Sequence, residues 1–228
     1  MGSVIAGNFF CSCFHESRFT YSVFRYPMLR TRSISGLASY LPPMADLTET
    51  QLSSEQLIDG VLPKAFRDEV RLPNDQTSLR EWIDHPGASA IVPLFDDGST
   101  LLVRQFRYPP RRTFLEVPAG KLDEPGEDPE DVARRELEEE TGVRAGRFEH
   151  AGTAYPCIGY SSERIHVFTA HDIERGSQSL AEGEFVEVVE MGFDEALRRA
   201  RQGDLKDMKT VTALVYAAAH ANETFGPA

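Results

Sequence analysis

Short stretches of alternating apolar and polar residues follow one another from about residue 60 to residue 191. Such alternation predicts strands that bury one face. The turn residues Pro73, Asn74 and Asp75 separate the first two stretches, so we expect a hairpin that is too small to bury its own apolar face. The polar residues before it, through about residue 56, are expected to be a linker. The predicted strands are residues 66–72, 77–83, 88–95, 100–106, 113–117, 148–154, 164–170 and 185–191.

Three other segments have helical spacing instead. In the first, Asp128 is a candidate N-cap, Pro129 suits the first helical position and Gly142 suits the left-handed stop. Strands outnumber helices and do not alternate with them regularly, so the sequence predicts an α+β fold with a mixed sheet. The predicted helices are residues 129–141, 193–202 and 206–221.

Charge divides the chain near residue 43. Residues 1–43 contain four arginines and one acidic residue, whereas residues 44–228 contain 20 basic and 35 acidic residues, a net charge of −15. So acidic a body argues against binding nucleic acid, and no apolar run of about 18 residues is present to span a membrane. Residues 1–43 are interpreted either as a non-functional extension or as a mitochondrial or plastid transit peptide. With few cysteines and no disulfide pattern, we expect the body to be cytoplasmic.

Three carboxylates of the first predicted helix, Glu136, Glu139 and Glu140, share one face because residues three and four positions apart are neighbours on a helix. Clustered carboxylates repel one another unless a cation lies among them, and hard cations such as Mg²⁺ or Mn²⁺ prefer such oxygen ligands. An isolated acidic run is more often a solvated helix face. The flanking residues therefore decide between the two interpretations.

Residues 120–143 resemble the Nudix box, Gx5Ex7REUxEExGU, where U is aliphatic. One departure is a six-residue gap between Gly120 and Glu127 where the pattern has five, and it falls in a loop, where an insertion leaves the helix register intact. The resemblance implies a Nudix-type α/β/α sandwich and metal-dependent hydrolysis of a diphosphate. The positions that match after the gap are Glu127, Arg135, Glu136, Leu137, Glu139, Glu140, Gly142 and Val143.

The same resemblance implies a set of metal ligands. Carried over by position, the ligands of Mg²⁺, with Mn²⁺ as a possible substitute, are the carboxylates of Glu136, Glu139 and Glu140 and the backbone carbonyl of Ala119. Glu139 is also a catalytic candidate. Arg135 is expected to orient the carboxylates by ion pairing.

Segments outside the box resemble the ADP-ribose pyrophosphatase branch of the family, which hydrolyses nucleoside diphosphate sugars. In Val-Arg-Gln-Phe-Arg, Arg107 matches a position that contacts the substrate phosphates and Arg104 is a weaker candidate. In Glu-Val-Pro-Ala-Gly, Glu116 is expected either to contact the nucleotide or to be structural. Ile158 replaces a proline associated with ADP-ribose specificity, which leaves GDP-mannose open as an alternative.

Two further features complete the predicted site. Glu182 and Glu184, in the loop before the last predicted strand, are both candidates for the general base that activates water. Trp82, the only tryptophan, either packs in a core or stacks on the adenine bound by a second subunit.

Together these features predict a Mg²⁺-dependent hydrolase that converts ADP-ribose to AMP and ribose 5-phosphate. The alternatives are GDP-mannose, a dinucleoside polyphosphate or coenzyme A as substrate, or a catalytically silent Nudix binding module. We expect a small antiparallel sheet for dimerisation in residues 44–87 and the Nudix domain in residues 88–228. The resemblance further implies a homodimer with composite active sites.

Overall fold

The computed structural model of the chain describes residues 45–61, 63–122, 126–180 and 182–224. The interpretations of residues 1–43 therefore lie outside the described residues. Within the described part, no helix combines the length and the apolar character needed to cross a membrane.

An antiparallel sheet comes first along the chain, with strand order β1-β2-β3. The predicted hairpin is present as β2 and β3, which turn between Leu72 and Gln76. The expected linker is wrong in part, because its second half belongs to β1. Every residue of β1 is exposed, so this strand has no buried face and no apolar alternation that would have revealed it. The bounds are β1 (Thr50–Asp59), β2 (Lys64–Arg71) and β3 (Thr77–Asp84).

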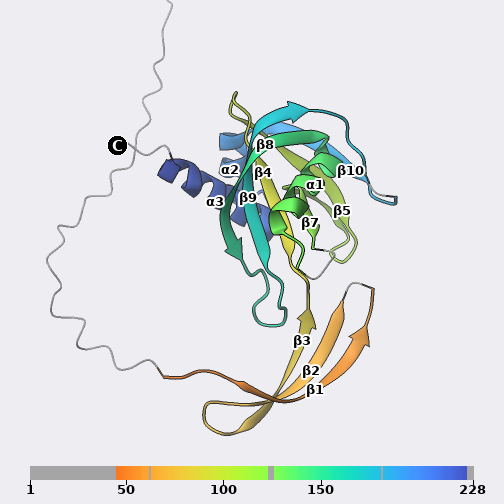
Figure 1. Ribbon diagram of the computed structural model, residues 1–228, viewed down its shortest axis with the longest axis vertical. Coiled ribbons are helices and arrows are strands. Elements are labelled where there is room, and N and C mark those ends of the chain that lie inside the picture. The colour runs from red at the N-terminus through yellow and green to blue at the C-terminus, as the bar shows by residue number, and fades with distance from the viewer. Residues whose placement is uncertain (1–44, 62, 123–125, 181, 225–228) are drawn as a thin grey trace, which may run out of the picture. The chain divides into compact units, whose positions relative to one another are not determined.

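Two further sheets, together with three helices, make up the rest of the described chain (Figure 1). One has the order β7-β4-β9-β8 and is mixed, because β4 and β9 run parallel while its other pairs are antiparallel. The other has the order β10-β5-β6 and is antiparallel. The strands are β4 (Ala88–Pro93), β5 (Ser99–Arg107), β6 (Arg112–Glu116), β7 (Ala119–Lys121), β8 (Val143–Ala154), β9 (Ile165–Arg175) and β10 (Val186–Gly192).

Three helices accompany these sheets: α1 (Pro129–Thr141), α2 (Phe193–Gln202) and α3 (Met208–Thr224). The predicted caps of α1 are confirmed. The side chain of Asp128 accepts a hydrogen bond from the backbone N–H of Glu130 at 2.9 Å, and Gly142 has a left-handed φ of 72°. α3 begins two residues later than expected, because Asp207 lies at its start and accepts a hydrogen bond from Thr210 N at 3.0 Å.

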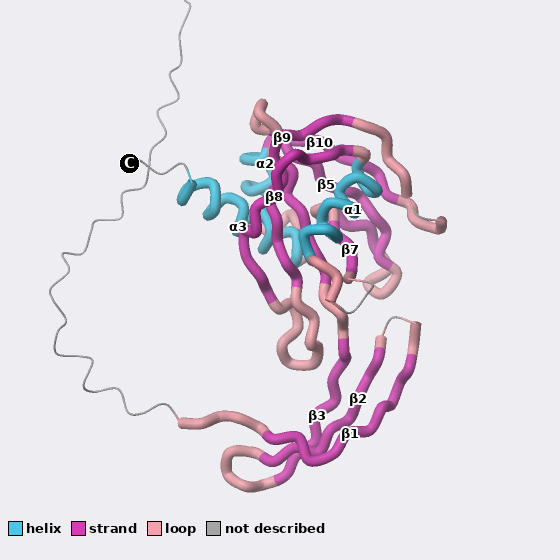
Figure 2. The backbone as a smooth tube through the Cα atoms, viewed as in Figure 1, coloured by secondary structure: helices cyan, strands magenta, loops and turns pink. Residues whose placement is uncertain are grey.

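The core has two parts, one on each side of the four-stranded sheet. Side chains alternate along β4, so that Val92 packs with Leu214 of α3 while its neighbour Ile91 packs with Leu137 of α1. Helices therefore cover both faces of the sheet, as Figure 2 shows for α1 on one side and α2 and α3 on the other. The predicted α+β class with an α/β/α sandwich is confirmed.

The chain enters this sandwich from β3. Ile83 donates its backbone N–H to the carbonyl of Tyr160 at 2.8 Å and accepts from Ser162 N at 3.0 Å. The loop between β8 and β9 is thereby tied to the end of β3. This contact places the loop beside the cavity described next.

Candidate active site

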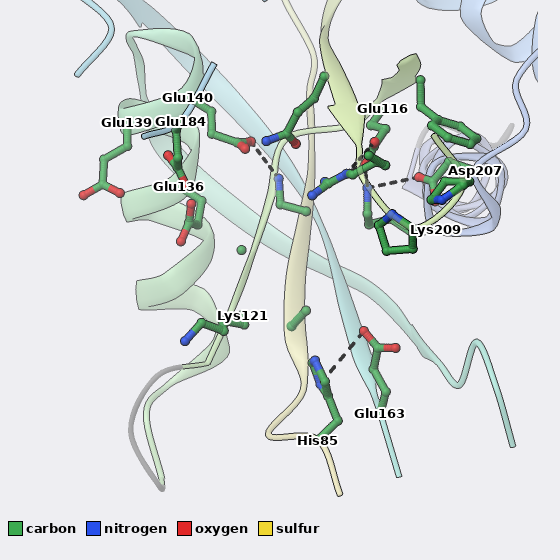
Figure 3. A pocket seen from close by; sticks show the side chains of 18 of the residues that line it. His85, Glu116, Lys121, Glu136, Glu139, Glu140, Glu163, Glu184, Asp207 and Lys209 are labelled. Atoms are coloured by element: carbon green, nitrogen blue, oxygen red, sulfur yellow. Dashed lines mark hydrogen bonds and ion pairs between the residues drawn. The ribbon is translucent and has the colours of Figure 1, made fainter. Parts of the chain in front are cut away.

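α1 presents its carboxylates to a cavity of about 670 Å³ (Figure 3). Val132, Ala133 and Leu137 of this helix are completely buried against the sheet, which fixes the rotation of the helix about its axis. The carboxylates predicted from helical spacing, Glu136, Glu139 and Glu140, all line the cavity, which confirms their common placement. The remaining lining comes from Arg135 of α1, the start of β4, β5, β6, β7 and the start of α3, with further residues from the loops.

Glu140 is the most enclosed of these carboxylates, with only 6% of its surface exposed. Its Oε2 accepts a hydrogen bond from the backbone N–H of Ala119 at 3.0 Å. Burial raises the pKa of Glu140 to about 7, which the Ala119 hydrogen bond opposes and the neighbouring Glu136 reinforces. Burial also raises the pKa of Glu136; Arg135 opposes this shift, while Glu139 and Glu184 add to it. Both groups are therefore carboxylates whose negative charge is poorly compensated.

Arg135 supplies part of the compensation. Its Nη1 lies 2.7 Å from Oε1 of Glu136 and 3.5 Å from Oε2 of Glu139. Its Nη2 lies 3.8 Å from Oε1 of Glu127. Arg135 thus lies where its ion pairs hold the carboxylates, as predicted, and Glu127 is close enough to contribute to holding Arg135.

Gly120 makes room for this arrangement. A Cβ atom at this position would lie 2.0 Å from the carboxylate carbon of Glu136, which is far inside van der Waals contact. A larger residue here would require the Glu136 side chain, whose outer atoms occupy this space, to move away. Glycine at the first position of the motif therefore lets Glu136 lie directly against β7.

The chemistry of these donors suits a divalent cation, because carboxylate and carbonyl oxygens from one cavity wall are the ligands that Mg²⁺ and Mn²⁺ prefer. The side chains do not converge on a single point: among the described residues, no group of three acidic, histidine or cysteine side chains is arranged to hold a metal ion. Glu136 and Glu139 are instead turned toward Arg135. The set fits a cation in its chemistry, and binding would require these two side chains to rotate.

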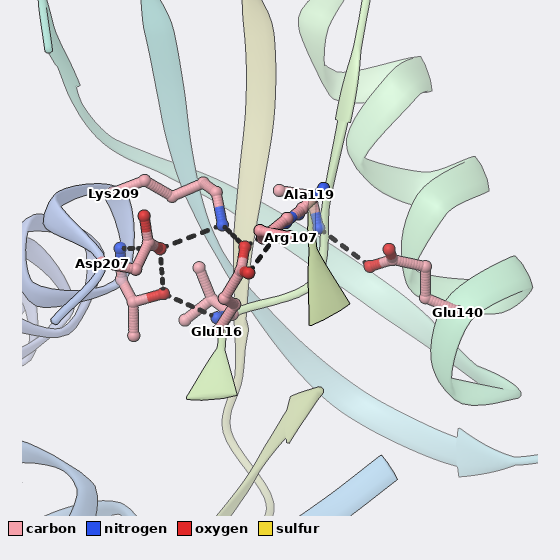
Figure 4. A network of polar contacts seen from close by, with 8 residues as sticks. Arg107, Glu116, Ala119, Glu140, Asp207 and Lys209 are labelled. Carbon is pink, nitrogen blue, oxygen red and sulfur yellow. Dashed lines mark hydrogen bonds and ion pairs between the residues drawn. The ribbon is translucent and has the colours of Figure 1, made fainter. Parts of the chain in front are cut away.

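A second charged cluster lies across the cavity from α1 (Figure 4). Arg107 donates from Nε and Nη2 to the two carboxylate oxygens of Glu116, both at 2.8 Å. Lys209 of α3 donates to Oε2 of Glu116 at 2.6 Å and to Asp207 at 3.0 Å. Burial alone would raise the pKa of Glu116, but the hydrogen bonds and charges of Arg107 and Lys209 keep it below its usual value.

The predicted site residues of β5 separate onto opposite faces of that strand. Arg107 and Gln105 line the cavity, whereas Arg104 lines a different hollow and pairs there with Glu187, its Nε lying 3.1 Å from the carboxylate. Alternation along a strand requires this separation, because residues three apart point to opposite faces. The structure therefore brings Arg107, but not Arg104, to the predicted site.

The two candidates for the general base also differ in position. Glu184 lines the cavity, where Figure 3 places its carboxylate beside that of Glu136, and its charge contributes to the raised pKa of Glu136. Glu182 is exposed and is not among the residues that line the cavity. Sequence could not distinguish them, because they lie two residues apart in one loop.

Trp82 does not line the cavity of its own chain. It stacks on Phe66 of the neighbouring strand at a ring separation of 5.2 Å, and its Nε1 donates to Asp68 at 2.9 Å. This arrangement agrees with the packing interpretation for a single chain. It does not address a role in a neighbouring subunit.

Sequence reasoning missed several residues that the fold brings to the cavity. Lys209 and Asp207 stand at the start of α3, where Asp207 could have been noticed as a helix N-cap but nothing local links Lys209 to a site. His85 and Glu163 face one another at 4.0 Å, and Figure 3 places them at the end of the cavity away from the carboxylates. Gln105 and Lys121 are further polar residues of the cavity that were not predicted.

Comparison with known proteins agrees with this geometry. The model of the NUDIX domain family matches residues 84–213. An ADP-ribose pyrophosphatase of Bacillus subtilis is 40% identical over 175 residues, which cover 76% of this chain and 94% of that protein. A GDP-mannose pyrophosphatase of Yersinia enterocolitica is 37% identical over 153 residues, or 62% of this chain and 78% of that protein.

A solved structure described as an ADP compounds hydrolase superposes with a TM-score of 0.68 at 20% identity, covering 78% of this chain and 96% of that one. At this identity the match supports the fold alone. Taken together, the family match and the relatives show that this chain belongs to the Nudix family. It is an enzyme of the pyrophosphohydrolase class, and the resemblance to the ADP-ribose pyrophosphatase branch is confirmed.

Proposed function

We propose that this chain hydrolyses ADP-ribose to AMP and ribose 5-phosphate with Mg²⁺ as its cation. The observation that carries the proposal is the pairing of two opposite walls in one cavity. The carboxylates of α1 form one wall and the Arg107 guanidinium belongs to the other. A diphosphate needs both, because cations offset its charge from one side and a planar donor group binds its oxygens from the other.

The cation would be held by Glu136, Glu139, Glu140 and the carbonyl of Ala119. When bound, it would offset phosphate charge and lower the pKa of a bound water. The raised pKa values of Glu136 and Glu140 support this role, since both carboxylates lack compensation that a divalent ion provides.

On the opposite wall, Arg107 would bind and orient the diphosphate. Its Nε and Nη2 are used by Glu116, and among the described residues none accepts a hydrogen bond from Nη1, which leaves this group for a phosphate oxygen. Glu184 would accept a proton from the attacking water, because it lines the cavity and Glu182 does not. Water then adds to one phosphorus, the bond from that phosphorus to the bridging oxygen breaks, and the departing phosphate keeps that oxygen.

GDP-mannose is a second candidate substrate. The pyrophosphatase of Yersinia enterocolitica supports it, as does Ile158 at the position of the expected proline. Ile158 is 83% exposed in the loop between β8 and β9, so it is not fixed by packing and lies where a ligand or a second subunit has access. The greater identity to the ADP-ribose pyrophosphatase favours ADP-ribose.

The test is a set of hydrolysis rates measured under one condition with Mg²⁺ on ADP-ribose, GDP-mannose, NADH, diadenosine polyphosphates and coenzyme A. We expect the largest kcat/KM for ADP-ribose. A larger kcat/KM for GDP-mannose would make GDP-mannose the substrate and would leave the assignment as a nucleoside diphosphate sugar hydrolase unchanged. No turnover of any compound would support the silent binding module.

We also propose that the active form is a homodimer. Leu52, Leu57, Ile58 and Leu79 of the first sheet are exposed large apolar side chains, and a three-stranded sheet of this size needs a partner surface for stability. A second copy of the chain would provide that surface, and Trp82 of each subunit would then lie near the nucleotide pocket of the other subunit.

A further inference from the structure

Lys209 connects the start of α3 to the wall of the cavity that carries Arg107. Its ammonium nitrogen lies 2.6 Å from Glu116 Oε2 and 3.0 Å from Asp207, and its side chain is 15% exposed. Lys209 and Glu116 are 93 residues apart in sequence. The contact is therefore made only by the folded chain.

Glu116 is the residue through which Lys209 would act. Its side chain is 3% exposed, and its two oxygens receive two hydrogen bonds from Arg107 and one from Lys209. A carboxylate this deeply buried is costly unless charged donors surround it. If Lys209 lost its charge, Arg107 would be the remaining cation bound to the Glu116 carboxylate among the described residues.

We propose that Lys209 is a positioning residue for the diphosphate: it holds the Glu116 carboxylate in place, and Glu116 in turn holds the Arg107 guanidinium so that Nη1 is left for the substrate. The inference rests on the proposed role of Arg107 and deepens it. Lys209 itself is held by Asp207, so a chain of alternating charges runs from α3 to the cavity (Figure 4).

The backbone next to Glu116 is held by the same helix start. The Thr210 hydroxyl donates to Asp207 at 2.6 Å and accepts from the backbone N–H of Val117 at 2.9 Å. Two residues further, Ala119 N binds Glu140. Residues 116–119 are therefore fixed at one end by α3 and at the other by α1, so the position of Arg107 is set relative to the carboxylates.

The experiment compares Lys209→Met with the matched control Lys206→Met. Lys206 is exposed in the segment just before α3, and its ammonium binds the carbonyl of Gly203, away from the cavity. We expect Lys209→Met to raise KM for ADP-ribose about tenfold with kcat changed less than about twofold, in the range of couplings between contacting residues. Lys206→Met is expected to leave both constants unchanged.

A double-mutant cycle with Glu116→Gln separates positioning from direct contact. If Lys209 acts through Glu116, removing Lys209 has no further effect on KM once Glu116 is neutral. An equal effect in both backgrounds would show that Lys209 acts independently of Glu116 and would overturn the proposal. An unchanged KM for Lys209→Met, or a loss confined to kcat, would overturn it as well.

Binding of inorganic pyrophosphate with Mg²⁺, measured by calorimetry, repeats the cycle without turnover. If the wild type hydrolyses no nucleotide sugar, the proposed function fails while these binding constants still test Lys209. Thermal unfolding of every variant reports folding. Should Lys209→Met not fold, Lys209→Gln keeps a donor without charge and carries the same expectation; no weakening of pyrophosphate binding in it would contradict the inference.

Discussion

Neutralising Glu140 should change stability and activity in opposite directions: without a metal ion the folded protein becomes more stable above pH 7, whereas the rate of hydrolysis falls. Glu140→Gln keeps the shape of the side chain and an oxygen that accepts the hydrogen bond from Ala119 N. The pKa of Glu140 rises from 4.5 to about 7 because the carboxylate is buried. Since each pKa unit corresponds to about 1.4 kcal/mol, ionised Glu140 costs the folded protein about 3 kcal/mol.

The sign of the pH dependence follows from this pKa. Below pH 4.5 the carboxyl is protonated in both the folded and the unfolded chain, so the wild type and Glu140→Gln are expected to be equally stable. Between pH 4.5 and about 7 the unfolded chain loses this proton before the folded chain does, and the wild type loses stability. Above pH 7 the variant should be more stable by up to about 3 kcal/mol, or about 6–12 °C in Tm.

The assay is thermal unfolding in EDTA at pH 4 and pH 8. Glu138→Gln is the control, because the side chain of Glu138 is on the same helix but 41% exposed, and its pKa is lowered by Arg144. This control should not gain stability at pH 8. If Glu140→Gln is no more stable than the wild type at pH 8, burial does not disfavour the charge of Glu140 and the reasoning is refuted.

With Mg²⁺ in place of EDTA, the wild type should become more stable to heat than Glu140→Gln. A ligand that binds only the folded chain raises its Tm, and Glu140→Gln should lose most of that gain together with at least about a hundredfold in kcat. A variant that hydrolyses ADP-ribose at the wild-type rate in Mg²⁺ would remove Glu140 from the proposed metal ligands.

The parts of the site that sequence predicted are those fixed by a local repeat. Helical spacing alone places Glu136, Glu139 and Glu140 on one face, and the caps Asp128 and Gly142 set where that helix begins and ends. Strand alternation would also have separated Arg104 from Arg107, because they are an odd number of residues apart. These features need no knowledge of the rest of the fold.

The parts that sequence missed depend on contacts between distant segments. β1 is exposed along its length, so its strand conformation comes from pairing with β2 and not from an apolar repeat of its own. The ion pair between Lys209 and Glu116 joins residues 93 positions apart, and an isolated lysine at a helix start gives no sign of its partner. Side chains of this kind become identifiable only when the sheets and helices are packed.

The remaining predictions concern the walls of the cavity and the assembly. Arg107→Lys keeps a cation beside Glu116 but removes the planar fork, so KM for ADP-ribose should rise about tenfold with little change in kcat or Tm; steady-state kinetics giving an unchanged KM would mean that Arg107 serves Glu116 alone. Glu184→Gln should lower kcat at least about a hundredfold whereas Glu182→Gln leaves it near the wild-type value, since only Glu184 lines the cavity; the opposite order in the same assay would exchange the two assignments. The homodimer should be visible by light scattering at micromolar concentration, and one chain's mass with full activity would exclude it. Within that dimer, Trp82→Phe keeps the stack on Phe66 but removes the larger indole and its hydrogen bond to Asp68. A raised KM with an unchanged dimer mass would place Trp82 in the partner's pocket. An unchanged KM would limit Trp82 to packing in its own sheet.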